Sequence, residues 1–288
     1  GGGVPAGEVR GGGVATASAK SPLPFTVGAA LSSLLHGYDT GVIAGALLLI
    51  VPHFGLESQP ALVGAIVTAC TVGAFLGTAV ISPWALDTQG RAGSLRASSI
   101  LFIAAGIMLA YSPSVSYLIA GRFIAGIGMG VASAAVPLYV SETTPPESRG
   151  AMATIPQLFI SSGILLSYVV DLIILLAFKG GWRWMMGASL IPALAQTIAA
   201  VWLPESPRWL LRSKARGSSG AGDDNVSLAR ASLQRLRGDG VDVGPELSQM
   251  IQAVKTENEE KEKKNKSMSG GEGGGGGGGF VGMLKSKP

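Results

Sequence analysis

The sequence predicts an all-α membrane protein with six transmembrane helices. Of its 288 residues, 47% are hydrophobic and only 14% are charged, and the charged residues gather in short segments and near the C-terminus. This distribution is typical of a multi-pass membrane protein with a soluble tail. Apolar windows of about 20 residues recur, and each is long enough to cross a hydrocarbon core about 30 Å thick. No segment has the alternating apolar and polar residues of β-barrel strands.

The apolar windows define the elements in chain order. They cover residues 24–50, 61–84, 95–111, 116–140, 152–178 and 184–203. The two triples of helices are candidates for a 3+3 inverted repeat, in which two three-helix units cross the membrane in opposite orientations.

The loops predict the orientation of these helices. If the spans alternate, Lys179 and Arg183 are the basic residues on one side, and many more fall on the other. By the positive-inside rule, the more basic side and both ends of the chain are cytosolic. The net charge of +4 therefore reflects the orientation of the chain in the membrane. The sequence has no basic stripe with interleaved aromatic residues, which is the pattern that would indicate nucleic-acid binding. The basic residues of the predicted cytosolic side are Arg10, Lys20, Arg91, Arg96, Arg149, Arg208, Arg212, Lys214 and Arg216.

The chain outside the spans divides into three segments. Residues 1–23 are rich in Gly and Ala, which predicts a flexible N-terminal segment. Residues 204–266 contain VSLARASLQRLR, a short amphipathic helix in which Leu228, Ala231 and Leu236 share a face, and then a charged linker. Residues 267–288 combine a Gly-rich tether with FVGMLKSKP, which reads as the approach to a further span. We therefore expect a missing C-terminal six-helix half, or a partner chain that supplies it.

Asp39 and Arg122 are charged residues that lie inside apolar windows. Asp39 lies in LLHGYDTGVIAGALLLI and Arg122 in YLIAGRFIAGIGMG. At about 1.5 Å per residue, Asp39 is roughly 22 Å and Arg122 roughly 21 Å from the cytosolic face. Intramembrane charges are costly and usually have a partner, so we expect these two to pair at one depth. A proton on Asp39 would break the pair, which is the chemistry of a proton-coupled gate; the alternative is a static ion pair that locks helix packing.

No pattern in the sequence predicts an enzyme. The chain has no nucleophile with a base, no metal-ligand cluster and no phosphate loop in a strand-helix context, because GIGMG lies inside a membrane helix. We expect no cofactor and no metal, with H⁺ as a coupling ion. The one cysteine, Cys70, lies in the second span and excludes an intramolecular disulfide.

Three stretches carry a resemblance to a known family. IAGIGMGVASAAVPLYVSETTPPESR combines glycines with an aromatic, an acidic and a basic residue at fixed spacing, GWRWMMG precedes the sixth span, and PESPRWLL follows it. Over about residues 24–240 the chain resembles the sugar porter family of the major facilitator superfamily. The resemblance implies the amino-terminal half of that fold. The positions that match in the first stretch are Gly126, Gly130, Tyr139, Glu142 and Arg149.

The resemblance also implies site residues. Asp39 and Arg122 match the proton site of symporters in the family. Gln157 aligns with a glutamine that contacts sugar, and Ile164 lies seven residues on, on the same helix face. An amide suits a sugar hydroxyl because it both donates and accepts hydrogen bonds, although Gln157 could instead bond a neighbouring helix. His36 replaces a phenylalanine near the sugar and shares a face with Asp39; packing is an alternative role.

Charges at the cytosolic helix ends resemble the inner gate of the family. The fingerprint between spans two and three is degraded to PWALDTQGRA, which predicts a weaker gate. The alternative is that these charges only set topology. The gate candidates are Asp87, Arg91, Glu142, Arg149, Glu205 and Arg208.

The resemblance implies proton-coupled transport of a small-molecule sugar, a hexose-like monosaccharide, across a lipid bilayer by alternating access. Within the family, the chain looks similar to vacuolar monosaccharide transporters of plants, and inositol and polyol symporters are close competitors. There are two alternatives. The chain could be a carrier for another solute, or a truncated regulatory half that transports nothing.

Overall fold

The computed structural model describes residues 21–177, 181–212, 221–238 and 240–270, all of which belong to helices or the connections between them. It forms two units, residues 1–243 and 244–288. Six helical segments are long and apolar enough to span a membrane, which confirms the predicted fold class and number of spans. They are Leu23–Phe54, Pro60–Thr88, Gly90–Tyr111, Val115–Thr143, Arg149–Ala177 and Trp182–Trp202.

Four of these spans are single α-helices. They are α1 (Leu23–Phe54), α4 (Gly90–Tyr111), α5 (Val115–Thr143) and α6 (Arg149–Ala177). Helix α1 is followed by Gly55, whose φ of 63° gives a left-handed C-terminal cap that few other residues adopt without cost. Helix α5 is preceded by the N-cap Ser114, whose hydroxyl accepts a hydrogen bond from the Tyr117 N–H at 3.3 Å.

The other two spans are interrupted. The second consists of α2 (Pro60–Leu76), a π-helical turn (Gly77–Ile81) and α3 (Ser82–Thr88). Pro83 lacks the N–H of a regular helical bond, and a π turn just before it is one way to absorb the irregularity. The sixth consists of α7 (Trp182–Gly187) and α8 (Leu190–Trp202).

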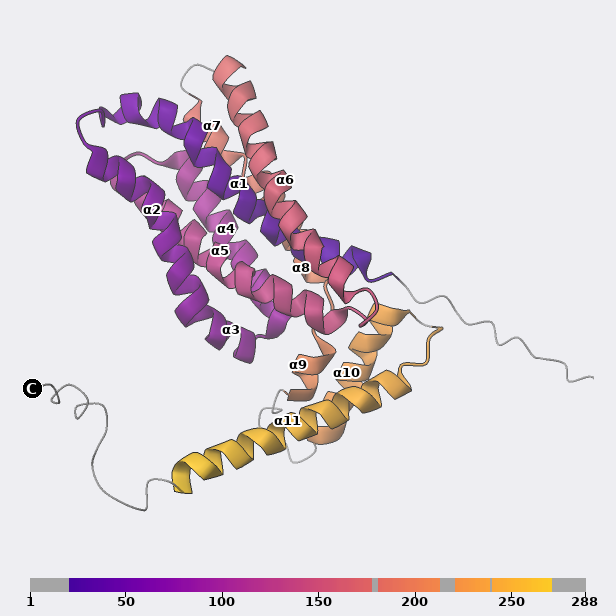
Figure 1. Cartoon of the computed structure of the whole chain (residues 1–288). Coiled ribbons are helices and arrows are strands. Elements are labelled where there is room, and N and C mark those ends of the chain that lie inside the picture. The colour runs from indigo at the N-terminus through magenta and orange to yellow at the C-terminus, as the bar shows by residue number, and fades with distance from the viewer. Residues whose placement is uncertain (1–20, 178–180, 213–220, 239, 271–288) are drawn as a thin grey trace, which may run out of the picture. The chain divides into compact units, whose positions relative to one another are not determined.

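Close backbone approaches hold the bundle together. Helix α1 runs beside α6 and forms its most extensive contacts with it, and α5 packs on α2 and α4 (Figure 1). A Cβ atom on Gly126 would lie 2.1 Å from the Cys70 carbonyl, and one on Gly130 would lie 2.3 Å from that of Ala74. Glycine at these positions of α5 therefore brings α2 and α5 into backbone contact, as in other tightly packed membrane helices.

The predicted amphipathic helix is present as α10 (Ala221–Arg237), after the short α9 (Pro207–Arg212). The predicted face was right at Leu236, which is buried, and wrong at Leu228, which is 54% exposed, and Ala231, which is also exposed; Ala229 and Leu233 are buried instead. The buried stripe is 229/233/236, which has the four- and three-residue spacing of one helix face. In the second unit the described part is α11 (Gly244–Gly270), which contains the mixed-charge segment and the first four residues of the predicted tether. The predicted N-terminal lead up to residue 20 and the tether from 271 lie outside the described residues.

Candidate functional site

A cavity of about 220 Å³ opens between α1, α5 and α6; we call it the polar cavity for the five polar side chains in its lining, although apolar atoms make up most of the lining surface. His36 and Gln157 both line it, so the structure brings together two of the predicted sugar-contact residues. Ser32, Ser33 and Ser133 add hydroxyl groups. The Ser32 hydroxyl is buried and has no hydrogen-bond partner among the residues described. Donors and acceptors without protein partners are what a polar solute would need.

The third predicted contact, Ile164, does not line this cavity. The isoleucine of α6 that does is Ile160, one turn nearer to Gln157. A Cβ atom on Gly37 would lie 3.0 Å from the Ile164 nitrogen, so the Ile164 backbone packs directly on α1. Spacing along α6 predicted a shared face but not how closely α1 would approach it.

Asp39 and Arg122 lie together inside the bundle. Their exposed fractions are 3% and 2%, and Nη1 of Arg122 donates a hydrogen bond to the backbone carbonyl of Asp39 at 2.9 Å. The predicted common depth is therefore consistent with a direct contact between α1 and α5. Neither residue lines the polar cavity, although His36 is only one turn from Asp39 on α1.

The contact between these residues differs from the expected ion pair. Within the described chain, the Asp39 carboxylate forms no ion pair with Arg122, and Nε of Arg122 is buried without a partner. The guanidinium donates instead to the main-chain carbonyl of Asp39. The structure thus shows the two groups adjacent but unpaired.

The predicted gate contains a buried ion pair. Nε of Arg91 lies 2.8 Å from Oε2 of Glu142, and Nη2 of Arg91 donates to Oε1 at 2.9 Å. Both side chains are at least nine-tenths buried, at 6% and 4% exposure. The Ser206 hydroxyl also donates to Glu142. Three chain segments, at the starts of α4 and α9 and the end of α5, therefore meet at one carboxylate.

Glu205 caps the start of α4. Its carboxylate accepts hydrogen bonds from the backbone N–H groups of Arg91, Ala92 and Gly93 at 2.7, 3.1 and 3.2 Å. A carboxylate is favourable there because the first N–H groups of a helix have no partner within the helix and carry a partial positive charge. The approach requires Gly90, whose φ is 80° and whose Cβ atom, if present, would lie 2.6 Å from the carboxylate.

Three predicted gate residues lie outside this cluster. Asp87 and Arg149 are exposed, and Nη2 of Arg149 donates to the Thr144 carbonyl at 3.4 Å. The contact at Asp87 is made by its backbone, whose carbonyl accepts from Nε1 of Trp209 at 3.3 Å. Arg208 is half-buried and forms no hydrogen bond or ion pair with another residue that the structure describes.

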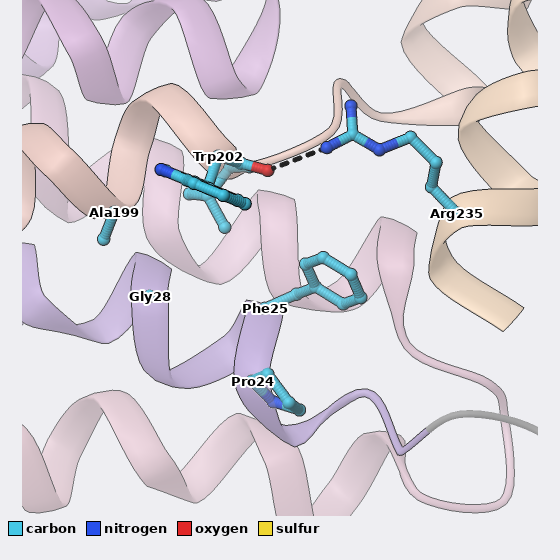
Figure 2. A pocket seen from close by; sticks show the side chains of 7 residues that line it. Pro24, Phe25, Gly28, Ala199, Trp202 and Arg235 are labelled. Atoms are coloured by element: carbon cyan, nitrogen blue, oxygen red, sulfur yellow. Dashed lines mark hydrogen bonds between the residues drawn. The ribbon is translucent and has the colours of Figure 1, made fainter. Parts of the chain in front are cut away.

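A second cavity, of about 460 Å³, lies between the start of α1, the end of α8 and α10. Figure 2 shows Phe25 and Trp202 at this cavity and Arg235, whose Nη2 donates to the Trp202 carbonyl at 3.2 Å. It contains none of the predicted site residues. The polar cavity is therefore the better candidate site.

Comparison with known proteins identifies the family. The family described as sugar (and other) transporter matches residues 25–272. The chain belongs to this family. Monosaccharide-sensing protein 3 of Arabidopsis thaliana is 39% identical over 236 residues, which are 82% of this chain and 31% of that protein. Probable inositol transporter 2 of the same plant is 39% identical over 239 residues, or 82% of this chain and 38% of that protein. The chain thus spans about a third of these relatives' length.

Solved structures of the xylose transporter XylE from E. coli share the fold. The partially occluded inward-open conformation superposes with a TM-score of 0.72 at 27% identity, covering 84% of this chain and 60% of that chain. The major facilitator superfamily proton:xylose symporter XylE bound to 6-bromo-6-deoxy-D-glucose gives 0.71 at 27% identity, covering 82% and 53%. These matches confirm the resemblance to the amino-terminal part of a major facilitator transporter.

Sequence reasoning missed two buried charges, Asp171 and Arg237. Asp171 lies in α6 and is 6% exposed, and both of its carboxylate oxygens are buried. The signal was available, since Asp171 interrupts an apolar window just as Asp39 does. No partner at a matching depth was evident for it in the sequence.

Proposed function

We propose that this chain forms one half of a proton-coupled monosaccharide transporter that works by alternating access. It would hold part of the sugar site and the proton-coupling residue, and it would act in a vacuolar or plasma membrane with both ends cytosolic. The polar cavity is the observation that carries the proposal. Its imidazole, amide and hydroxyl groups suit sugar hydroxyls, because each can donate or accept a hydrogen bond.

The size of the cavity supports a shared site. Complete pockets for drug-sized ligands measure about 300–1,000 Å³, and this cavity of about 220 Å³ falls below that range. A second six-helix half, or a partner chain, would supply the opposite wall. The site of many transporters lies between two such repeats near the middle of the membrane.

The contact between α1 and α5 supports proton coupling. Arg122 is held at the Asp39 backbone, so a small rotation of the Asp39 side chain would allow an ion pair. An ionised Asp39 would favour that pair, and a protonated Asp39 would leave the guanidinium on the carbonyl. The protonation state of Asp39 would therefore determine which of two arrangements the two helices adopt. This would bias the half toward one conformation.

The gate would be the Arg91–Glu142 pair with the Glu205 cap. Because the pair is buried rather than exposed, breaking it in each cycle would need compensation by new contacts in the other half. The degraded PWALDTQGRA fingerprint still supplies Arg91 for the ion pair and Gly90 for the cap.

The test is uptake of labelled hexose by vesicles under an imposed pH gradient, with this chain alone and with a co-expressed second half from a relative. We expect Asp39→Asn to abolish gradient-driven accumulation and Gln157→Ala to weaken hexose binding. The matched controls are Thr40→Val and Leu158→Ala, which alter exposed neighbours outside the cavity. Accumulation at the wild-type level in Asp39→Asn would exclude Asp39 as the coupling site.

Competition by xylose and myo-inositol would separate the sugar proposal from the inositol, polyol and other-solute alternatives.

A regulatory half is the second candidate function. It is favoured by the monosaccharide-sensing proteins among the relatives, at 39% and 40% identity. Co-purification with a full-length relative, together with hexose binding but no uptake in either vesicle preparation, would support it. Uptake with the second half present would instead support the transporter.

A further inference from the structure

Asp171 is a carboxylate buried between α6 and α1. The residue is 6% exposed, and within the described parts of the chain no side chain bonds to either carboxylate oxygen; the polar group beside the carboxylate is the backbone of Gly45. Asp39, the proposed coupling residue, lies six residues before Gly45 on α1, and Gly45 is the residue against which Asp171 packs. At about 1.5 Å per residue, the two carboxylates are therefore about 9 Å apart along the helix axis.

Glycines of α1 create the place where Asp171 lies. Gly37, Gly41 and Gly45 recur at four-residue spacing and face α6. A Cβ atom on Gly41 would lie 2.1 Å from Oγ of Ser167, and one on Gly45 would lie 2.4 Å from Oδ2 of Asp171. The contact of Gly37, Gly41 and Gly45 with α6 is called the glycine seam below. The carboxyl group of Asp171 packs against the α1 backbone at the outer end of this seam.

The potential partners near the glycine seam are engaged elsewhere. The Tyr38 hydroxyl donates to the Met185 carbonyl at 2.8 Å, and Arg122 donates to Asp39. Nη2 of Arg183 donates to the Ser112 carbonyl at 2.9 Å. No titratable or charged side chain on the helices packed against α6 pairs with Asp171 within the described structure. These side chains are His36, Tyr38, Asp39 and His53 of α1, Tyr117, Arg122, Tyr139 and Glu142 of α5, and Arg183 of α7.

An ionised carboxylate cannot occupy such a site at low cost. Burial of an isolated charge is so unfavourable that the group takes up a proton instead. A neutral acid has no such penalty and can pack against the glycine backbone. Asp171 also lies six residues, or about 9 Å, from the end of α6, so solvent at that end is a short path for its proton.

We propose that Asp171 is a second proton-binding site, which carries a proton while α1 and α6 are closely packed and whose ionisation opens the outer part of the glycine seam. The reaction is addition of one proton to a carboxylate oxygen and its release to water. The site is separate from the Asp39–Arg122 contact and does not rest on the proposed function.

Infrared spectroscopy of the purified 288-residue chain in nanodiscs tests the protonation directly. A protonated carboxylic acid has a carbonyl band that an ionised carboxylate lacks. We compare Asp39→Asn with the double variant Asp39→Asn/Asp171→Asn at neutral pH, so that Asp39 contributes to neither spectrum. We expect the double variant to lose an acid band that Asp39→Asn retains. Superimposable spectra would overturn the proposal.

The pH dependence of thermal unfolding tests the link to packing. Wild type should lose several degrees in Tm relative to Asp171→Asn as pH rises from mildly acidic to mildly alkaline, because only wild type then acquires an uncompensated charge in the glycine seam. Asp171→Leu, which removes the polar group, should show the same flat dependence as Asp171→Asn. Parallel curves for wild type and both variants would contradict the proposal. Neither experiment measures transport, so failure of the proposed function leaves both readouts intact.

Discussion

Arg91 and Glu142 form a buried ion pair with two close contacts, at 2.8 and 2.9 Å, between the start of α4 and the end of α5. Because both charges are out of water, removing one leaves the other without compensation. Loss of one partner of a buried pair costs about 3–5 kcal/mol. The pair therefore fixes one end of the bundle as well as serving as a gate candidate.

We expect Glu142→Gln to lower the free energy of unfolding by about 3 kcal/mol or more for this reason. Denaturant or thermal unfolding in detergent measures the change. Glu147→Gln, at an exposed position near the end of the same helix, is the control and should lie within about 0.5 kcal/mol of wild type. Equal effects of the two substitutions would show that the Arg91–Glu142 contact contributes nothing specific.

Gly90→Ala should also destabilise the chain. The substitution places a side chain at a φ of 80° and brings its Cβ atom to 2.6 Å from the Glu205 carboxylate. Left-handed backbone alone costs a non-glycine residue about 1 kcal/mol or more, and displacement of the cap adds to that. Gly150→Ala is the control, because a Cβ atom there meets nothing within 4 Å and α6 should tolerate it. Unfolding free energies that match for the two variants would contradict this account of Gly90.

Removal of the Glu205 carboxylate should weaken the start of α4. We expect Glu205→Ala to cost about 1–2 kcal/mol, which is the upper range for loss of a helix N-cap, since three N–H groups lose an acceptor. Hydrogen exchange at Arg91, Ala92 and Gly93 measures the local effect. Glu205→Gln keeps one acceptor oxygen and should fall between wild type and Glu205→Ala. Unchanged exchange in Glu205→Ala would show that another group caps α4.

The spans were predictable from the sequence because long apolar windows leave few alternatives to a membrane helix, and the six windows match the six helices. The adjacency of Asp39 and Arg122 followed from counting residues to a common depth. The details of their contact did not, since rotamers and the reach of the guanidinium decide whether a carboxylate or a carbonyl accepts the bond.

The least predictable contacts were those between residues that are far apart in the sequence and meet only in the folded chain. Glu205 lies more than 100 residues from the helix it caps, and only the folded chain brings it to Arg91. Asp87 belongs to the same motif as Arg91, yet its side chain is exposed. All of the gate candidates are charged, so the sequence could not tell them apart. In the structure, the extent of their burial distinguishes the residues of the cluster from the others.

Packing along the glycine seam predicts a strong effect of Gly37→Ala. Its Cβ atom would lie 2.0 Å from the Ile160 carbonyl oxygen, which belongs to the backbone and cannot rotate away. We expect α1 and α6 to separate and the Tm of the chain to fall by several degrees, because core overpacking costs about 1–3 kcal/mol. Gly64→Ala in α2 provides the matched control, with nothing within 4 Å of its Cβ position. If Gly37→Ala unfolds at the same temperature as Gly64→Ala, the close approach of the helices is not needed for stability.

His36→Phe tests whether the imidazole at the polar cavity contributes a hydrogen bond to the solute. The His36 ring lines the cavity and bonds to no other residue in the described structure, so it is available to a ligand. Phenylalanine keeps an aromatic ring but removes the bond, which contributes about 0.5–1.5 kcal/mol, and hexose affinity should therefore fall roughly twofold to tenfold. His53→Phe makes the same substitution near the end of α1, where the ring packs on Phe54 and Trp182, and should leave hexose affinity unchanged. Titration of both variants with hexose and xylose measures affinity and preference together. Profiles of His36→Phe that match wild type would assign His36 to packing and leave Gln157 and the serines as the sugar-contact candidates.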